Sequence, residues 1–249
     1  MSGHSKWATI KHKKGALDAQ RGKLFSRIIK EITIAARDGG NPEMNPKLRT
    51  VIDSAKEVNM PSDNIKRAIQ RGTGELPGIT VEEINYEGYG PGGIAVLVET
   101  MTDNRNRITA EVRKIFSRSG GSLGEAGCVS WMFSKKGCIG IKKETIDEDK
   151  LLEIAMESGA DDVKTDDAEV YEIITNPGNF MEIKESLKGQ KIPIEYEELS
   201  MIPQSYIKVE KDLAKQVLAL IENLEENDDV SAVYANFDIP DDIMAELQE

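Results

Sequence analysis

The stretch Gly72-Thr73-Gly74-Glu75-Leu76-Pro77-Gly78 divides the sequence into two parts with different patterns. Glycine and proline break both helices and strands, so a stretch with this composition is typical of a loop. Before it, apolar residues recur at helical spacing, and after it strand-like runs alternate with helical ones. We therefore predict a domain boundary here, between a helical region and a mixed α/β region.

Three helices are predicted on the amino-terminal side of this boundary. The first covers Lys23–Arg37, where apolar residues form a broad stripe. The second runs from Pro46 to about Val58, with Asn45 as its N-cap. The third covers Ser62–Gly72, with Ser62 as its N-cap and Gly72 as its end. The second and third helices fit either a helix-turn-helix or an αα-hairpin, and the hairpin is favoured because cations near a helix carboxyl end need no ligand.

The part after Gly78 is predicted to contain two α/β domains. The predicted strands are 81–89, 93–101, 127–133, 137–143, 169–175, 194–201, 205–209 and 230–237, and the predicted helices are 104–117, 147–157, 179–187 and 212–225. In the simplest packing, the last elements complete the sheet begun at Val81, so the compact unit between them is an insertion.

The predicted fold class is therefore α+β and multidomain. An amino-terminal helical domain precedes two sandwich-like, ferredoxin-like α/β domains, one inserted in the other. The domain ranges are residues 1–75 for the helical domain, 76–133 plus 203–249 for the discontinuous domain, and 134–202 for the inserted domain.

The charges are split along the chain in the same way. Residues 1–73 hold 15 Lys and Arg against 7 Asp and Glu, a net charge of +8, whereas the remainder holds 17 against 37, a net charge of −20. Such asymmetry indicates a module that binds a polyanion, joined to a part of the chain that does not contact the polyanion. The alternative is a solvated charge imbalance without a ligand.

The basic residues of the helical region are the candidate nucleic-acid contacts. Lysines and arginines displace counterions from phosphates, and Trp7 either stacks on a base or packs on the following helix. The predicted contacts are Lys6, Trp7, Lys11, His12, Lys13, Lys14, Arg21, Lys23, Arg27, Lys30, Lys66, Arg67 and Arg71.

Two arginines stand at the start of the helix predicted after Asp103, where the helix dipole favours anions. Asp103 itself is suited to cap this helix. Either an anion such as phosphate binds there, or a carboxylate elsewhere in the fold neutralises the arginines. The helical wheel places Arg105 near the buried stripe, which favours an internal ion pair. It points Arg107 and Arg113 outward, either towards a bound anion, as a candidate anion site, or towards solvent.

No catalytic arrangement is found in the sequence, so we expect no enzyme, no cofactor and no small-molecule substrate. Cys128 and Cys138, with His4 and His12 far away, form no disulfide framework and no zinc spacing, and we assign no metal. No stretch approaches the roughly 20 apolar residues of a membrane span, and Met1–Gly15 lacks the core of a secretory signal. We expect a cytoplasmic protein without a membrane partner.

Several short motifs, in this order and spacing, resemble the YebC family over essentially the whole chain. The motifs are Gly3-His4-Ser5-Lys6-Trp7, Lys11-His12-Lys13-Lys14, Arg21-Gly22-Lys23, Asn45-Pro46, Asn59-Met60-Pro61, Tyr86-Glu87-Gly88-Tyr89-Gly90-Pro91-Gly92-Gly93, Asp103-Asn104-Arg105-Asn106-Arg107 and Ser200-Met201-Ile202-Pro203. The glycine-rich motif lies between two predicted strands and is interpreted as a hairpin turn. The chain departs from the family at Ile108, where Thr is usual, and at Cys128, where Ser is common.

The resemblance implies a helical first domain, two α/β domains and a role in gene expression. Bacterial members are described as "probable transcriptional regulators" that bind DNA, mitochondrial relatives are translational activators, and some bacterial members act on ribosomes. The resulting hypothesis is a non-enzymatic DNA-binding transcriptional regulator. The alternative is a ribosome-associated translational activator that binds ribosomal RNA through the same basic arm, the segment Gly3–Lys14 before the first predicted helix. Phosphate neutralisation is common to both, so the residues do not separate DNA from RNA.

Overall fold

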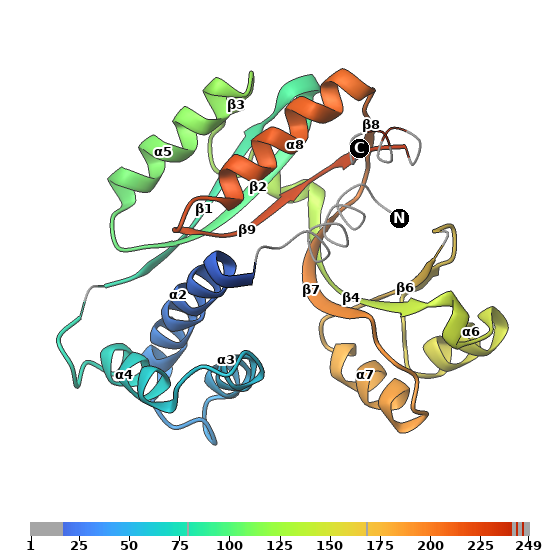
Figure 1. Ribbon diagram of the computed structural model, residues 1–249, viewed down its shortest axis with the longest axis horizontal. Coiled ribbons are helices and arrows are strands. Elements are labelled where there is room, and N and C mark those ends of the chain that lie inside the picture. The colour runs from blue at the N-terminus through green and yellow to red at the C-terminus, as the bar shows by residue number, and fades with distance from the viewer. Residues whose placement is uncertain (1–16, 79, 168, 241–242, 244–245, 247–249) are drawn as a thin grey trace. The chain divides into compact units, whose positions relative to one another are not determined.

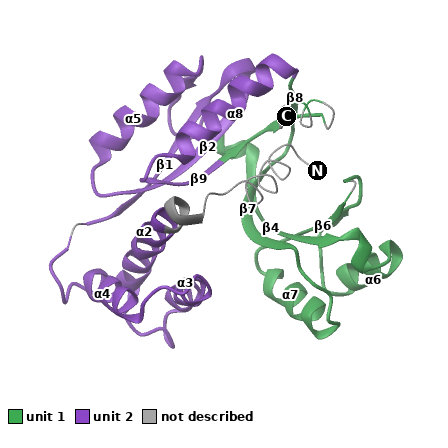
Figure 2. Cartoon of the chain, viewed as in Figure 1, with its two compact units in different colours: residues 1–9, 129–209, 234–249 green, residues 10–128, 210–233 purple. Residues whose placement is uncertain are grey.

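The computed structural model describes residues 17–78, 80–167, 169–240, 243 and 246, and their side chains from Gly22 onward. Two compact units are present, each formed by separate stretches of chain (Figure 2). In the described part, unit 2 contains residues 17–128 and 210–233, and unit 1 contains 129–209 and the residues from 234 onward.

Unit 2 opens with the three predicted helices: α2 (Leu17–Ala35), α3 (Pro46–Glu57) and α4 (Ser62–Gly72). Helix α2 packs against both of the others, as Figure 1 shows. Their apolar stripes meet in one core, made of Ile28, Ile32, Ala35, Ala36, Leu48, Ile52, Ala55, Met60 and Ala68. Apolar burial of this kind, about 25 cal/mol per Å², is what holds short helices together in water.

The beginnings of α3 and α4 are built differently. The side chain of Asn45 accepts a hydrogen bond from the amide of Leu48 at 3.0 Å and donates to the carbonyl groups of Ala35 and Gly39, so the predicted cap of α3 is confirmed. The predicted cap of α4 is wrong, because Ser62 is already its first helical residue. The carbonyl of Pro61, which accepts from Asn64 at 2.9 Å, starts the hydrogen bonding of that helix.

Gly72 lets α4 approach α2 closely. A Cβ atom at this position would lie 2.4 Å from the Thr33 carbonyl oxygen and 2.6 Å from the Ala36 Cβ. We expect Gly72→Ala to lower the free energy of unfolding by about 1 to 3 kcal/mol, because backbone atoms must shift. Urea denaturation would measure this. Gly22→Ala in α2, where nothing lies within 4 Å, is the control and should raise stability by about 0.5 to 1 kcal/mol. Equal effects of the two changes would contradict the close approach.

The first sheet, apart from the last two residues of its final strand, belongs to unit 2 and has the strand order β3-β1-β2-β9. Its strands are β1 (Glu82–Tyr89), β2 (Ala95–Thr102), β3 (Ser122–Leu123) and β9 (Val230–Ala235), and its helices are α5 (Arg105–Arg118) and α8 (Lys211–Glu225). Phe116 of α5 packs at Gly88 and Leu220 of α8 at Gly90, so both helices cover the same face (Figure 1). A turn at Pro91–Gly93 joins β1 to β2, which confirms the hairpin.

Unit 1 contains the second sheet, with the order β5-β6-β4-β7 and antiparallel pairing throughout. Its elements are β4 (Phe133–Lys142), α6 (Glu148–Glu157), β5 (Asp162–Lys164), β6 (Val170–Thr175), α7 (Phe180–Gly189) and β7 (Tyr196–Pro203). This βαββαβ succession is the ferredoxin-like one. A separate short pair joins β8 (Ile207–Lys208) to β10 (Phe237–Asp238). The α+β prediction is confirmed, and the exact domain boundaries stay a prediction.

The structure corrects three details of the predicted elements. The strand predicted at 127–133 is wrong, because Gly127 has a φ of +89° and Ser130–Met132 forms a 3₁₀ helix before β4 begins. Strands β3 and β5, with two and three residues, were not predicted because they are too short to show a period. The cap of α5 is Asn104, whose side chain accepts from the Arg107 amide at 3.1 Å, and not Asp103.

Candidate nucleic-acid interface

The predicted contacts divide into three groups according to where they lie. The residues of the basic arm, Lys6, Trp7, Lys11, His12, Lys13 and Lys14, lie outside the described residues, and Arg21 lies in α2 with its side chain outside the description. The second group is on α2 and the third on α4.

The α2 cations are already engaged by acceptors in unit 2. Lys23 donates to the carbonyl of Glu226, and its Nζ lies 3.8 Å from a carboxylate oxygen of Asp228. Arg27 pairs with Glu31 at 2.8 Å, one turn along the same helix. Any phosphate that binds this helix face must therefore compete with acidic groups of the protein, which weakens its attraction.

Lys30 reaches a nearly buried carboxylate, Asp229, in the turn between α8 and β9. The Lys30 Nζ lies 2.8 Å from Asp229 Oδ1, Arg107 Nη2 lies 2.6 Å from Oδ2, and the Thr102 hydroxyl donates to Oδ2 at 2.8 Å. Burial disfavours the charged carboxylate, but hydrogen bonds from Lys30, Arg107 and Thr102 outweigh it and lower the pKa of Asp229. This carboxylate joins the helical bundle to the first sheet.

The arginines at the start of α5 are neutralised by carboxylates. Arg107 pairs with Asp229 and with Asp103, the latter at 2.7 Å, and these hydrogen bonds raise its pKa. The second of the two alternatives, neutralisation from elsewhere in the fold, therefore describes Arg107, and an anion at this predicted site would have to displace both carboxylates. Arg113 is exposed and has no ion pair with a described residue.

The internal ion pair predicted for Arg105 is wrong. Its side chain is 67% exposed and lies 3.7 Å from the carboxylate of Glu82, which is 56% exposed. Arg105 is the first residue of α5, one turn before the buried stripe begins at Ile108, so its side chain projects past the packed face. Such an exposed pair contributes little, about 0 to 1 kcal/mol.

The α4 cations form the open part of the basic surface. Lys66, Arg67 and Arg71 are all exposed, while Ala68 of the same helix is buried in the bundle core. None of the three has an ion pair with a residue that the structure describes. Arg49 on α3 shares these properties and was not predicted. Helical periodicity could have indicated it, because it lies on the polar side of a helix that buries Leu48 and Ile52. We refer to Lys66, Arg67 and Arg71 as the α4 cation face.

Three cations within one and a half turns suit a row of phosphates. Residues four apart on a helix are separated by about 6 Å along its axis, so Arg67 and Arg71 can reach neighbouring phosphate groups of one strand. Guanidinium groups bind phosphate oxygens in a bidentate way. The α4 cation face can therefore supply affinity that does not depend on base sequence.

The described residues show no metal site, no reactive Cys138 thiol and no membrane-spanning helix. No group of three or more His, Cys, Asp or Glu side chains among them could hold a metal ion. Burial raises the pKa of the Cys138 thiol well above its usual range, which keeps it protonated and unreactive. In the described part of the chain, every helix is too short or too polar to cross a membrane.

Two sequence profiles match the chain on either side of residues 76–80. One, described as "TACO1/YebC protein N-terminal domain", matches residues 5–75, and the other, described as "TACO1/YebC second and third domain", matches residues 81–237. Together they cover the helical bundle and both four-stranded sheets.

Similar proteins match over nearly their whole length. A "probable transcriptional regulatory protein" of Syntrophobacter fumaroxidans is 56% identical over 98% of both chains, and one of Geobacter sulfurreducens is 56% identical over 99% of this chain and 100% of its own. A crystal structure of a conserved hypothetical protein from Aquifex aeolicus shares 50% identity and a TM-score of 0.81, covering 95% of this chain and 98% of that one. The fold described above is therefore also found in a crystal structure.

Proposed function

This chain belongs to the TACO1/YebC family, and from that premise we propose that it is a non-enzymatic, DNA-binding regulator of transcription. The observation that carries the proposal is the α4 cation face, which is exposed and has no carboxylate of the described residues in ion-pair distance. The names of the relatives from Syntrophobacter and Geobacter point to the same role.

The charge distribution supports binding of nucleic acid by the helical bundle and not by the sheets. The segment before Gly74 carries a net charge of +8 and the segment after it a net charge of −20. A negative field repels phosphates, so nucleic acid approaches the helical bundle and avoids the sheets. We propose that the basic arm before α2 and the α4 cation face contact the phosphate backbone together. Lys23 and Lys30 join them only after exchanging their present acceptors.

Crosslinking in cells tests the proposal and identifies the nucleic acid. A photoreactive amino acid at Gln70, a half-buried α4 position between Arg67 and Arg71, should crosslink to DNA. The control is the same amino acid at Glu153, an exposed position on α6 in the acidic unit 1, which should give no nucleic-acid adduct. Adducts with ribosomal RNA alone would contradict a role in transcription and would support the alternative, a ribosome-associated translational activator. Equal yields from the two positions would contradict an interface at α4.

A further inference from the structure

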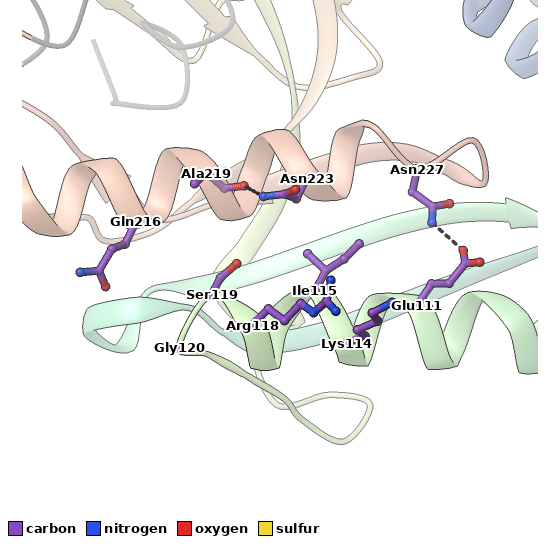
Figure 3. A pocket seen from close by; sticks show the side chains of 10 residues that line it. All are labelled: Glu111, Lys114, Ile115, Arg118, Ser119, Gly120, Gln216, Ala219, Asn223 and Asn227. Carbon is purple, nitrogen blue, oxygen red and sulfur yellow. Dashed lines mark hydrogen bonds between the residues drawn. The ribbon is translucent and has the colours of Figure 1, made fainter.

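A groove runs along the surface of unit 2 between α5 and α8 (Figure 3). Its volume of about 740 Å³ lies within the range of about 300 to 1,000 Å³ found for ligand sites. The residues that line it are Glu111, Lys114, Ile115, Arg118, Ser119, Gly120, Gln216, Ala219, Asn223 and Asn227. Ile115 and Ala219 give it an apolar strip, and polar side chains surround them.

The α5 side of the groove carries an excess of positive charge, although it belongs to the acidic part of the chain. Helix α5 carries five Lys and Arg residues against one Glu, although the chain after Gly74 as a whole has a net charge of −20. Two of these cations, Lys114 and Arg118, line the groove, are exposed, and have no ion pair with any described residue. Unlike Arg107, they are not neutralised by the fold, so an anionic ligand would be attracted to them.

The α8 wall supplies amide groups. Gln216 and Asn223 are exposed, and the amide nitrogen of Asn223 donates to the Ala219 carbonyl. Asn227 closes one end by donating to the Glu111 carboxylate at 2.7 Å. Amide side chains both donate and accept, as a peptide backbone does. The Glu111 carboxylate also makes that end unfavourable for a second carboxylate.

The spacing of the cations fits an extended chain. Lys114 and Arg118 are four residues apart on a helix, a rise of about 6 Å. Alternate side chains of an extended peptide are about 6.7 Å apart on one side, so two carboxylates in that register can meet both cations. Sites for single-stranded nucleic acid combine cations with aromatic side chains for base stacking, and the residues that line this groove include no aromatic one.

We propose that this groove binds an acidic peptide segment of a partner protein in an extended conformation. Lys114 and Arg118 pair with its alternating carboxylates, the amides of Gln216 and Asn223 bond its backbone, and small side chains lie on Ile115 and Ala219. The site is separate from the α4 cation face, so it gives the protein a way to contact another protein while the helical bundle holds nucleic acid.

Fluorescence anisotropy with a short labelled peptide of alternating glutamate and alanine tests the proposal on the full chain. We expect the double variant Lys114→Gln, Arg118→Gln to weaken binding by about tenfold or more, because both charge pairs are lost. Arg113→Gln with Lys215→Gln is the matched control, since it removes two exposed cations from the same helices outside the groove lining and should change affinity by less than about threefold. Asn223→Asp, which places an anion in the wall, should weaken binding without removing a cation.

Two results would overturn the proposal. One is an equal loss of affinity in the groove variant and in its matched control, which would show that only overall charge matters. The other is tight binding of a labelled oligoribonucleotide that depends on Lys114 and Arg118 while the acidic peptide does not bind, which would make the groove a nucleic-acid site. Circular dichroism of each variant confirms folding before the comparison. A lysine–alanine peptide should not bind wild-type protein.

Discussion

Replacing Lys66, Arg67 and Arg71 together by Gln is expected to weaken DNA binding about a hundredfold at about 0.1 M salt. These residues form the α4 cation face, which is exposed and has no ion pair with a described residue. Each lost phosphate contact removes the release of about one counterion, so the slope of log affinity against log salt should fall by about three. Electrophoretic or anisotropy titrations over a range of salt concentrations measure both quantities.

A matched control separates this effect from that of overall charge. Lys135, Lys150 and Lys188 are exposed lysines of unit 1 without an ion pair to a described residue. Their replacement by Gln changes the net charge by the same amount but should leave the salt slope unchanged, because these residues lie in the acidic part of the chain. If both triple variants lose affinity equally, the α4 cation face is not the interface. Sequence-independent losses of equal size on different DNA fragments would identify the contacts as phosphate contacts.

Asp229→Asn is expected to lower the free energy of unfolding of unit 2 by about 2 kcal/mol at neutral pH. The Asp229 side chain is 8% exposed and accepts hydrogen bonds from Lys30, Arg107 and Thr102. An amide cannot accept from all three, and it leaves Lys30 without a carboxylate partner and Arg107 with Asp103 alone. The loss stays below that of a fully buried pair, because the Lys30 and Arg107 side chains are 22% and 44% exposed and can turn to water.

The effect of this variant should depend on pH in a defined direction. Hydrogen bonds from Lys30, Arg107 and Thr102 outweigh burial and lower the pKa of Asp229 in the folded protein. The stabilisation is therefore complete above the unfolded-state pKa of about 3.9 and is lost as the pH falls through the lower folded-state pKa. The difference between wild type and Asp229→Asn should shrink in strongly acidic solution. Urea denaturation followed by circular dichroism at several pH values measures it.

The neighbouring Asp228 provides the control. Its side chain is 83% exposed and lies 3.8 Å from Lys23, so Asp228→Asn should change stability by less than about 0.5 kcal/mol. Equal stability losses at the two positions would mean that the Asp229 contacts do not fix the helical bundle to the first sheet.

Most of the regular elements follow from local sequence patterns. The apolar spacing of Lys23–Arg37 and the caps around Pro46 predicted two helices, although α2 begins at Leu17, six residues before the predicted start. The glycine-rich turn between β1 and β2 was recognised from composition. The very short strands β3 and β5 were not predicted from the sequence, because they form by pairing with β1 and β6. Their residues have no period of their own to detect.

By itself, the sequence determined the helical and mixed regions, the split of charge and a set of candidate cations in the helical part. Tertiary structure alone decided which of those cations remain open. Lys30 and Arg107 meet Asp229 from 199 and 122 residues away, whereas Lys66, Arg67 and Arg71 meet no carboxylate of the described residues. The physical reason is that helix periodicity acts between neighbours in sequence, whereas ion pairing depends on distance in space, which only the folded chain sets.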